Sequence, residues 1–332
     1  MSAPPAQATL IEDRGEAAAD EQFFRSPQFL AAEGVTHTLR IESKEGMLVA
    51  PLIVREIEGT GQRDAVSPYG YPGIVGGEGR GGLLPDPLAS LAPSVRTKTP
   101  PPLDPSAIDF SGTGLVSVFL RHRLGPSPLA GATERNVVQI ADPELPPKSR
   151  PSDRRQVRRN LEAGYAVEIV PGSETSPEQR ASFLAAYEQT MRRTSAAAHY
   201  FFGGGYFDRI LAADRTWLAL ALAPGDEVAA ASIAAVSDGY LHYYLSGSAD
   251  AHLRDSPMKS VVAGLVEHAT ELGLPLNLGG GIVAGDALEE FKRGFANRQL
   301  AWTTSELICD AERYAELAAG REGSGYFPAY RA

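Results

Sequence analysis

Lys292 is the residue of this sequence best placed for chemistry. It follows Phe291, an apolar residue that would fix the backbone of a short helix at this point. Lysine carries a compact positive charge on a long stem, so it can lie beside a carbonyl oxygen and stabilise negative charge that develops there. An ordinary surface lysine on a helix is the alternative. We predict an acyl-transfer site in which Lys292 is the working residue.

A run of glycines, Gly279, Gly280 and Gly281, directly follows an apolar strand pattern and precedes the lysine. Glycine is favoured where another group approaches the backbone closely or where φ is positive. The run therefore predicts part of the same site, with a bulge or a tight turn as the alternative. A second glycine run, at 203–205, is interpreted as a flexible connection without chemistry.

The elements that would position these residues lie between 217 and 278. Apolar runs at 217–223 and 228–237 are joined by a turn-rich segment, and an aromatic strand pattern follows at 240–248. A helix pattern begins at Ser256-Pro257, and a further strand pattern follows it. This order resembles the core of Gcn5-type acetyltransferases. The expected fold class is α/β (α+β), with a mixed, mainly antiparallel sheet flanked by helices.

The loop before the expected helix argues against a CoA site. In Gcn5-type enzymes a glycine-bearing loop at this place lets backbone N–H groups close on the pyrophosphate. The segment 252–259 has no glycine, carries Asp255, and loses one N–H donor at Pro257. We expect a degenerate CoA pocket and no cofactor.

Several short motifs together resemble the FemX/FemAB family, whose members move an amino acid from aminoacyl-tRNA onto an amine. The motifs are Ser67-Pro68-Tyr69-Gly70-Tyr71-Pro72-Gly73, Thr190-x-x-Arg193 with the later Tyr206-Phe207, Tyr244-Leu245-Ser246-Gly247-Ser248, and Gly279-Gly280-Gly281 with Phe291-Lys292-x-Gly294-Phe295. They are spread over most of residues 20–300. The resemblance implies tandem acetyltransferase-like domains with aminoacyl-tRNA as co-substrate. It extends to compact cell-wall enzymes and to stand-alone tRNA-dependent enzymes of antibiotic pathways, such as those of uridyl peptides.

The same resemblance assigns roles to individual residues. Lys292 corresponds to the lysine beside the aminoacyl ester, and Arg193 to an arginine that binds substrate near the transfer site. Tyr244 is preferred over its neighbour Tyr243 because it precedes the Leu-Ser-Gly-Ser pattern, although aromatic strand residues are commonly core residues. The expected substrate-binding residues are Arg193, Tyr69, Tyr71, Ser67, Tyr244, Ser246, Gly279, Gly280, Gly281 and Tyr206.

A cluster of arginines stands out against the net charge of −10. Arg154 and Arg158, like Arg155 and Arg159, are four residues apart, so each pair stacks on one side of a helix. Such a cluster can bind the phosphates of tRNA or of a phosphorylated acceptor, or it can be a solvated surface. Both interpretations stay open.

The 332 residues are enough for two domains. An early hairpin pattern at 36–54, followed by an aromatic segment, repeats the arrangement of the later hairpin and suggests an internal duplication. We expect an N-terminal domain at 1–145, on which the segment 318–332 packs. A C-terminal domain at 146–317 would carry the transfer site. The Pro- and Gly-rich stretch 76–105 is expected to cover substrate, with a disordered insertion as the alternative.

Composition narrows the class of protein further. A single cysteine, Cys309, allows no internal disulfide and favours a reducing cytoplasm. The start of the chain lacks a basic segment followed by an apolar one, so we expect a cytoplasmic protein without a membrane partner. The histidines show no metal-ligand spacing, and the sequence contains no Gly-x-Ser-x-Gly elbow and no Walker loop. No metal site is expected.

Three functions remain at this stage. The first is amide-bond formation from aminoacyl-tRNA onto an amine of a peptide, an antibiotic precursor or a cell-wall precursor. The second is N-acyl transfer from acyl-CoA, and the third is a binding protein with an inactive site. The expected partners are the acceptor end of charged tRNA and an amine-bearing peptide or nucleoside-peptide, and relatives of this size are commonly monomers.

Overall fold

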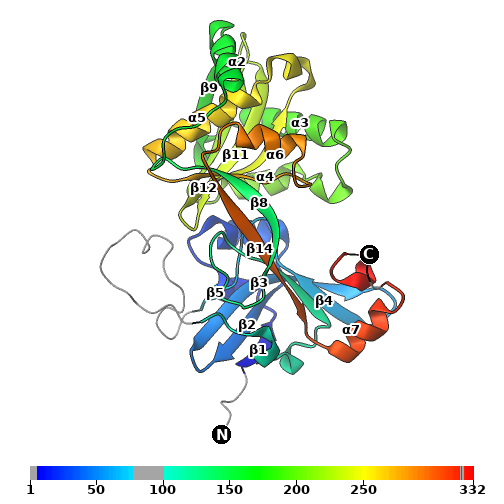
Figure 1. Ribbon diagram of the computed structural model, residues 1–332. Helices are drawn as coiled ribbons and strands as arrows, with labels where there is room; N and C mark the ends of the chain where they lie inside the picture. The colour runs from blue at the N-terminus through cyan, green and yellow to red at the C-terminus, as the bar shows by residue number, and fades with distance from the viewer. Residues whose placement is uncertain (1–5, 78–100, 322, 324) are drawn as a thin grey trace. The chain divides into compact units, whose positions relative to one another are not determined.

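The chain forms two compact units, each built on its own set of strands (Figure 1). The computed structural model describes residues 6–77, 101–321, 323 and 325–332. Unit 1 comprises Met1–Asp20, Phe24–Arg135 and Ala301–Ala332, and unit 2 comprises Glu21–Phe23 and Asn136–Leu300.

Unit 1 contains a sheet in the order β6-β1-β2-β3-β4-β7-β14, with the short β5 paired to β3. Pairing is antiparallel from β1 to β4, parallel between β4 and β7, and antiparallel between β7 and β14. The strands are β1 (Ala6–Ile11), β2 (His37–Ser43), β3 (Gly46–Ile57), β4 (Gln62–Val66), β5 (Val75–Gly76), β6 (Ile108–Asp109), β7 (Ser117–Arg121) and β14 (Arg298–Ile308). The helices are α1 (Pro27–Glu33) and α7 (Ala311–Ala318), with 3-10 turns η1 (Glu16–Ala18), η2 (Phe23–Arg25), η4 (Pro105–Ala107), η5 (Ser111–Thr113) and η9 (Ala329–Arg331).

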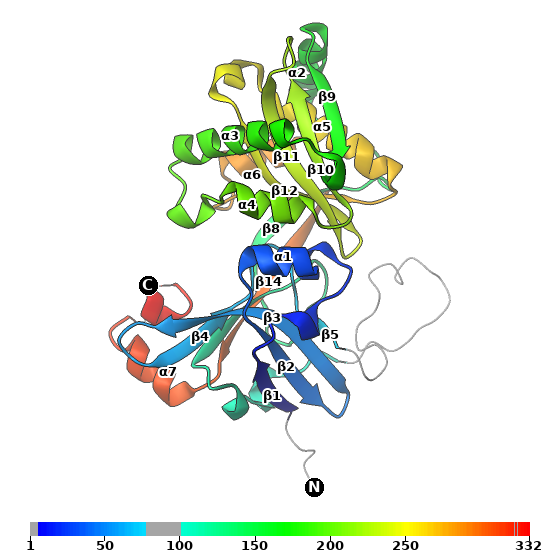
Figure 2. The ribbon, with the colours of Figure 1, turned by 180° about the vertical axis from the view of Figure 1, so that it is seen from behind.

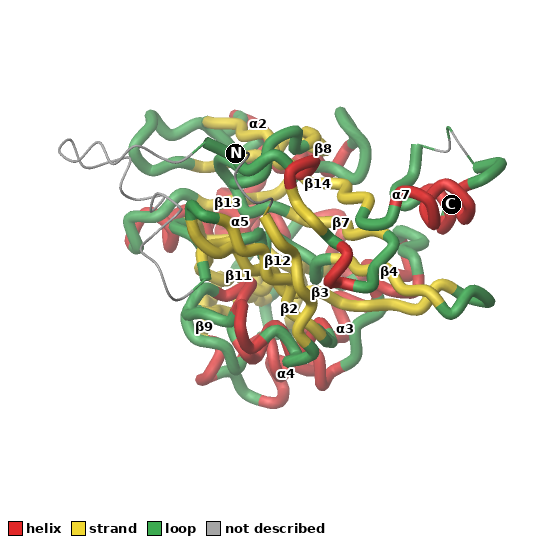
Figure 3. The backbone as a smooth tube through the Cα atoms, turned by 90° about the horizontal axis from the view of Figure 1, so that it is seen from below, coloured by secondary structure: helices red, strands yellow, loops and turns green. Residues whose placement is uncertain are grey.

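The alternation of apolar and polar residues in unit 1 gives its sheet one face for a core. Leu39 and Ile41 of β2 point into the core with Val118 and Leu120 of β7, and all four are fully buried. Burial of each such side chain contributes about 1.5–3 kcal/mol. Helix α7 lies beside the end of the chain, where Tyr330 packs on Tyr314 (Figure 3).

Unit 2 contains strands in the order β8-β13-β12-β11-β10-β9. Helices α3 and α4 cover one face of this sheet and α5 covers the other (Figure 2). The strands are β8 (Thr133–Ala141), β9 (Ala166–Pro171), β10 (Thr216–Leu222), β11 (Val228–Ser237), β12 (Tyr240–Ser248) and β13 (Leu276–Gly279). The helices are α2 (Pro151–Glu162), α3 (Pro177–Arg193), α4 (Gly204–Leu211), α5 (Met258–Glu271) and α6 (Ala287–Arg293), with η6 (Gly172–Glu174), η7 (Ala198–Tyr200) and η8 (Asp250–Asp255).

Local signals explain where the helices of unit 2 begin. Ser176 and Gln179 form the reciprocal capping box of α3, with Pro177 in its first turn. Phe183 and Tyr187, one turn apart, are then buried on the face of α3 that packs on β11 and β12. The polar cap and the apolar stripe together fix both the start and the orientation of the helix.

The two units share one pattern of strand pairing. In unit 2, β9 to β12 are antiparallel, β12 and β13 are parallel, and β13 pairs with β8 in antiparallel fashion. The same sequence of pairings occurs in unit 1 from β1 through β4, β7 and β14. This equivalence supports an internal duplication. The expected fold class, a mixed and mainly antiparallel sheet flanked by helices, is confirmed.

Each unit takes its last strand from a distant part of the chain. β8 follows unit 1 in sequence but pairs with β13 of unit 2, and β14 follows unit 2 but pairs with β7 of unit 1. Residues 136–145 therefore belong to unit 2 and residues 301–317 to unit 1, whereas the expected domains were 1–145 and 146–317. The segment 318–332 belongs to unit 1.

Most of the stretch 76–105 lies outside the described residues. In the described parts of the chain, no helix is both long and apolar enough to cross a membrane.

Candidate functional site

Lys292 lies near the end of α6 with only 8% of its surface exposed. Its Nζ donates a hydrogen bond of 2.6 Å to the carbonyl oxygen of Gly280, so the structure brings together two parts of the predicted site. The other two N–H bonds of this ammonium have no partner among the residues that the structure describes. Burial lowers the pKa of Lys292 to about 8, while the charge of Asp286 raises it. The side chain is a buried cation that can still donate two hydrogen bonds.

The glycine run is required by the groups packed against it. Gly279 has φ of +75°, a conformation that favours glycine. A Cβ on Gly280 would lie 2.6 Å from Nδ2 of Asn136, and a Cβ on Gly281 would collide with the carboxylate of Asp286. Asn136 also donates a hydrogen bond of 2.7 Å to the carbonyl of Gly281. The close approach predicted for this run is therefore present.

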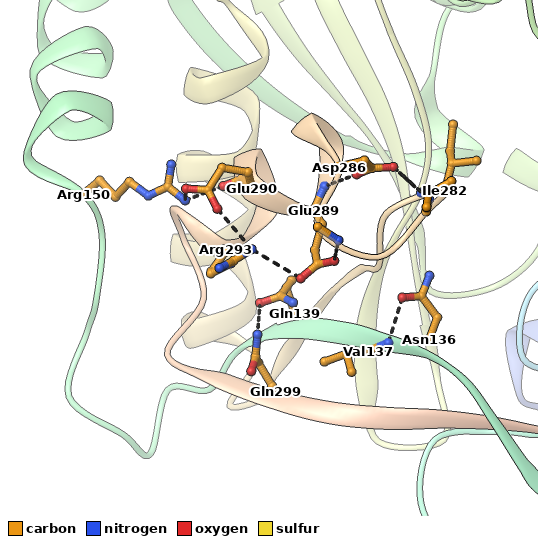
Figure 4. A network of polar contacts seen from close by, with 12 residues as sticks. Asn136, Val137, Gln139, Arg150, Ile282, Asp286, Glu289, Glu290, Arg293 and Gln299 are labelled. Atoms are coloured by element: carbon orange, nitrogen blue, oxygen red, sulfur yellow. Dashed lines mark hydrogen bonds and ion pairs between the residues drawn. The ribbon is translucent and has the colours of Figure 1, made fainter.

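Asp286 holds the loop between the glycines and α6 (Figure 4). One carboxylate oxygen caps α6 by accepting from the N–H of Glu289, and the other accepts from the N–H groups of Ile282 and Val283. These backbone hydrogen bonds, that of Glu289 first, lower the pKa of Asp286. Glu289 in turn accepts from the N–H of Gly285. The loop is thus fixed at several backbone positions.

A buried polar pair stands directly beneath the glycine run. His242 and Asn277 are opposite each other on the parallel strands β12 and β13, and both are almost fully buried. Nε2 of His242 donates to the carbonyl of Ser237 at 3.1 Å, and Nδ1 accepts from Nδ2 of Asn277 at 3.0 Å. Oδ1 of Asn277 accepts from the N–H of Gly279 at 2.9 Å. Burial lowers the pKa of His242 to about 4, so the ring is neutral at pH 7 and can hold this pattern.

Sequence reasoning missed this pair. His242 is one of the histidines that show no metal-ligand spacing, and Asn277 lies within the strand pattern that precedes the glycine run. A polar residue within each of two apolar strands was the available signal, because buried polar groups are nearly always hydrogen-bonded to a partner. The partner itself depends on which strands are neighbours. Among the described residues, no group of three or more His, Cys, Asp or Glu side chains could hold a metal ion.

A β-bulge in β12 sets the position of Tyr244. The register of β12 with β11 shifts between Ala234, which is opposite Tyr243, and Ile233, which is opposite Leu245. Tyr244 is the extra residue, and bulges commonly redirect a side chain near a site. Its hydroxyl lies 2.6 Å from the hydroxyl of Tyr206. The structure thus brings two of the predicted substrate-binding tyrosines together.

Tyr243 has different surroundings. Its ring packs against the core of unit 2, and its hydroxyl lies 2.6 Å from Oγ of Ser246. Burial raises the pKa of Tyr243 to about 12. Ser246, which was expected to bind substrate, is therefore engaged by Tyr243, while Tyr244 meets Tyr206.

Arg193 connects the end of α3 to the end of β12. Its guanidinium forms an ion pair with Asp250 and donates to Oγ1 of Thr190 at 3.0 Å. Thr190 in turn accepts from the N–H of Ser248 at 2.9 Å. The Thr190-x-x-Arg193 motif is thus a local tether, in which the arginine already has a carboxylate partner.

The Ser67–Gly73 segment belongs to unit 1 and is fastened along β7. The N–H of Ser67 donates to the carbonyl of Phe119, Oγ of Ser67 accepts from the N–H of Arg121, and the N–H of Gly73 donates to the carbonyl of Arg121. Ser67 is 1% exposed, so its hydroxyl positions backbone. Gly70, at φ of +89°, leaves room for the buried ring of Phe24.

The two tyrosines of this segment are half-buried and lie among other aromatic side chains. Tyr71 meets Phe24 and Trp302 edge-on, at centroid distances of 5.5 and 5.8 Å. The guanidinium carbon of Arg121 lies 5.4 Å from the centroid of the Tyr69 ring. The motif therefore presents its aromatic residues from a rigid loop of unit 1.

The arginine cluster lies on the exposed side of α2. Arg154 donates to Ser149, and Arg158 is 3.9 Å from Glu162. Arg155 and Arg159 have no ion pair or side-chain hydrogen bond among the described residues. Exposed charge of this kind can bind phosphate and is screened by salt.

The buried side of α2 packs on the beginning of α5. Asp153 forms an ion pair of 2.9 Å with Lys259, Gln156 donates to the carbonyl of Asp255, and Asn160 donates to Oγ of Ser260. Sequence reasoning did not find these contacts, because residues about 100 positions apart in the chain form them. Helix α2 thereby packs against the end of the segment 252–259, which leads into α5 and which in Gcn5-type enzymes would bind CoA.

Comparison with family profiles gives one match, which lies within unit 2. Residues 147–293 match the family profile described as an acetyltransferase (GNAT) domain. The comparison with curated proteins gave no match.

Solved structures share the fold at low sequence identity. The crystal structure of FemX aligns with a TM-score of 0.54 and 11% identity over 84% of this chain and 89% of the other. The C-terminal domain of a putative lysylphosphatidylglycerol synthetase from Agrobacterium fabrum aligns with a TM-score of 0.56 and 13% identity over 91% and 92% of the two chains. Residues 147–293 of this chain are thus similar in sequence to an acetyltransferase (GNAT) domain, and both solved structures share the fold of the chain.

Proposed function

We propose that this protein moves an amino acid from aminoacyl-tRNA to the amine of a peptide, an antibiotic precursor or a cell-wall precursor. The observation that carries the proposal is the buried ammonium of Lys292. It is held at the carbonyl of Gly280 and keeps two N–H bonds without a partner among the described residues. Its surroundings suit the stabilisation of an oxyanion at a carbonyl carbon.

The reaction needs the amine and the ester to be aligned and the oxyanion to be stabilised, and it needs no covalent enzyme intermediate. The neutral amine of the acceptor attacks the carbonyl carbon of the aminoacyl ester, and the carbonyl oxygen becomes an oxyanion. The ammonium of Lys292 donates to that oxygen. The intermediate then expels the ribose oxygen of the tRNA, which takes up the proton lost by the attacking nitrogen. The products are an amide and uncharged tRNA. Alignment of the two reactants supplies the larger share of the barrier reduction, about 7–11 kcal/mol in the best intramolecular cases.

The start of α5 supports aminoacyl-tRNA over acyl-CoA as the donor. Pro257 has no N–H, and the N–H groups of Ser256, Lys259 and Ser260 already donate to carbonyls within the same turn. A CoA pyrophosphate needs such N–H groups free at the beginning of a helix. Side chains of α2, Asp153 and Gln156, also contact Lys259 and the carbonyl of Asp255 at the start of α5.

The arginines of α2 are consistent with an RNA donor. Arg155 and Arg159 lie one helical turn apart on an exposed surface, within a chain whose net charge is −10. Local positive charge against an acidic background concentrates phosphate at that surface. We propose that this cluster contacts the phosphates of the tRNA acceptor end.

Transfer from acyl-CoA is the second candidate, because the profile that matches residues 147–293 describes an acetyltransferase domain. One experiment separates the two donors. The protein is incubated with a full set of charged tRNAs and candidate amines, and in parallel with acetyl-CoA and the same amines, and the products are read by mass spectrometry. Calorimetry with acetyl-CoA measures binding directly.

We expect aminoacylated product only with charged tRNA and no saturable heat with acetyl-CoA. Lys292→Met should lose the product, and Lys148→Ala, which alters an exposed lysine of the same unit, should retain it. Saturable binding of acetyl-CoA together with an acetylated amine would make CoA the donor and refute the proposal.

A further inference from the structure

Arg121 of β7 is a half-buried arginine surrounded by aromatic rings in unit 1. It stands opposite Thr304 of β14, and its neighbours Leu120 and Val118 point into the core on the other face. Its guanidinium carbon lies 5.4 Å from the ring centroid of Tyr69, 5.5 Å from that of Trp302 and 5.9 Å from that of Phe119. These distances are those of cation–π contacts.

The guanidinium of Arg121 has no hydrogen bond or ion pair among the described residues, unlike three other arginines of unit 1. Arg25 pairs with Asp20, Arg135 with Glu306, and Arg331 with the buried Asp64. A guanidinium has five N–H donors, and partly buried donors without a protein partner need water or a ligand.

We infer that Arg121, with Tyr69 and Trp302, forms a binding site for an oxyanion, either a carboxylate or a phosphate. The planar fork of a guanidinium matches both groups with two parallel hydrogen bonds. The surrounding rings hold the plane of the fork and exclude water on their side, which strengthens the charged hydrogen bonds. Arg135 adds positive charge, because its guanidinium carbon lies 5.8 Å from the centroid of the same Phe119 ring, although Glu306 offsets part of that charge.

The rigid segment beneath the site supports this assignment. Ser67 and Gly73 fasten the loop that carries Tyr69 to the backbone of β7 on either side of Arg121. Trp302 is fixed by the hydrogen bond of 2.8 Å from its indole N–H to the carbonyl of His122. The walls are thus pre-organised before a ligand arrives.

That the oxyanion belongs to the acceptor rests on the proposed function, whereas the binding itself does not. An acceptor with a free carboxylate or a phosphate group would be held by this contact. The site then selects acidic acceptors and leaves the chemistry to other residues.

The test uses Trp302 as its own reporter. The chain has two tryptophans, and Trp217→Phe leaves only the one beside Arg121. The fluorescence of this variant is titrated with sodium pyrophosphate, with inorganic phosphate, and with N-acetyl-alanyl-alanine. The same dipeptide with an amide in place of its C-terminal carboxylate tests whether the carboxylate itself is bound. Arg121→Gln and Arg121→Lys are added to the same background. Arg313→Gln, an exposed residue of α7, is the matched control.

We expect saturable quenching or enhancement by one class of probe and none by the dipeptide amide. Arg121→Gln should weaken that response about tenfold or more, Arg121→Lys should weaken it less, and Arg313→Gln should leave it unchanged. A response to pyrophosphate and phosphate assigns a phosphate, and a response to the dipeptide assigns a carboxylate.

Two results would overturn the inference. One is the absence of a response to every probe at millimolar concentrations. The other is an undiminished response in Arg121→Gln with a lowered melting temperature, which would make the arginine a structural cation–π partner. Because no transfer reaction is measured, failure of the aminoacyl-tRNA proposal would leave this result intact, and the reverse also holds.

Discussion

The two units have the same strand pairing but join their parallel strands in different ways. In unit 2 the connection from β12 to β13 contains α5, the usual solution for a parallel crossover. In unit 1 the connection from β4 to β7 has no α-helix in its described parts, residues 67–77 and 101–116. It begins instead with the aromatic segment Ser67–Gly73. The same pairing scheme thus carries a helix and a buried lysine in one unit, and aromatic rings around an arginine in the other.

The parallel strand pairing of each unit, called its joint below, also differs: it is β4 with β7 in unit 1 and β12 with β13 in unit 2. In unit 1 the paired residues are Ala65 with Val118 and Val66 with Phe119, all of them apolar. In unit 2 the joint includes the buried pair of His242 and Asn277. The fold can therefore close this joint with hydrocarbon alone. The polar pair of unit 2 is better explained by the hydrogen bond from Gly279 to Asn277, which positions the glycine run next to Lys292.

The largest expected effect separates the roles of the two units. Lys292→Met removes the buried cation of unit 2 and should lower kcat about 100-fold or more, because the loss of one oxyanion donor has that size. Arg121→Gln in unit 1 should raise KM for an acidic acceptor and change kcat little. Steady-state kinetics with the acceptor varied measures both. A loss of kcat in Arg121→Gln equal to that in Lys292→Met would show that the units do not divide the work in this way.

A second test makes the joint of unit 2 resemble that of unit 1. The double variant His242→Leu, Asn277→Val replaces the polar pair with hydrocarbon of similar size. Either single change leaves one buried polar group unsatisfied and should lower the free energy of unfolding by about 1–3 kcal/mol. The double variant should recover part of that stability, because the two side-chain groups that bond each other are removed together, whereas the carbonyl of Ser237 and the N–H of Gly279 still lose their partners.

Activity should not recover with stability in the double variant. Gly279 loses its acceptor on Asn277, so the carbonyl of Gly280 is no longer held for Lys292. We expect a fall in kcat of about tenfold, because small misplacement of a catalytic group has costs of this order. Chemical unfolding and kinetics on the same samples provide the comparison. Full activity in a stable double variant would reduce the pair to a structural role.

Sequence patterns predicted what depends on neighbouring residues. The aromatic strand expected at 240–248 is β12, and the local pattern of Ser176 and Gln179 forms a capping box at the start of α3. Periodicity and turn chemistry act over a few residues, so they can be read from one chain. The sequence also predicts that the glycine run and Lys292 belong to one site, and in the structure a hydrogen bond joins Lys292 to Gly280.

What could not be predicted depends on which strands become neighbours. The pairing of β8 with β13 and of β14 with β7 moves a strand of each half into the other unit, and no local signal encodes it. The hydrogen bond between His242 and Asn277 requires the register of two parallel strands. The bulge at Tyr244 is likewise a property of the pair β11 and β12. These features arise from tertiary packing, which overrides local preference.

The smallest expected effect is a pH shift that belongs to unit 2 alone. The pKa of Lys292 is lowered by burial to about 8 from an ordinary value of 10.5, so the ammonium that the oxyanion needs is lost as pH rises through about 8. Attack by the acceptor requires a neutral amine, which supplies the rising limb of the profile at lower pH. The falling limb of kcat/KM should therefore lie near pH 8, and Lys292→Met should lack it.

Asp286→Asn tests the origin of that limb, because the carboxylate raises the pKa of Lys292 and asparagine still caps α6. Without the charge, the falling limb should move to lower pH.

The free energy of unfolding should rise with pH over the range in which activity falls. Between about 8 and 10.5 the unfolded chain keeps the proton that the folded chain has lost, so the contribution of Lys292 to the free energy of unfolding rises with pH. The difference in free energy of unfolding between wild type and Lys292→Met, measured across this interval, isolates the contribution. A falling limb that stays in place in Asp286→Asn would mean that another group controls it.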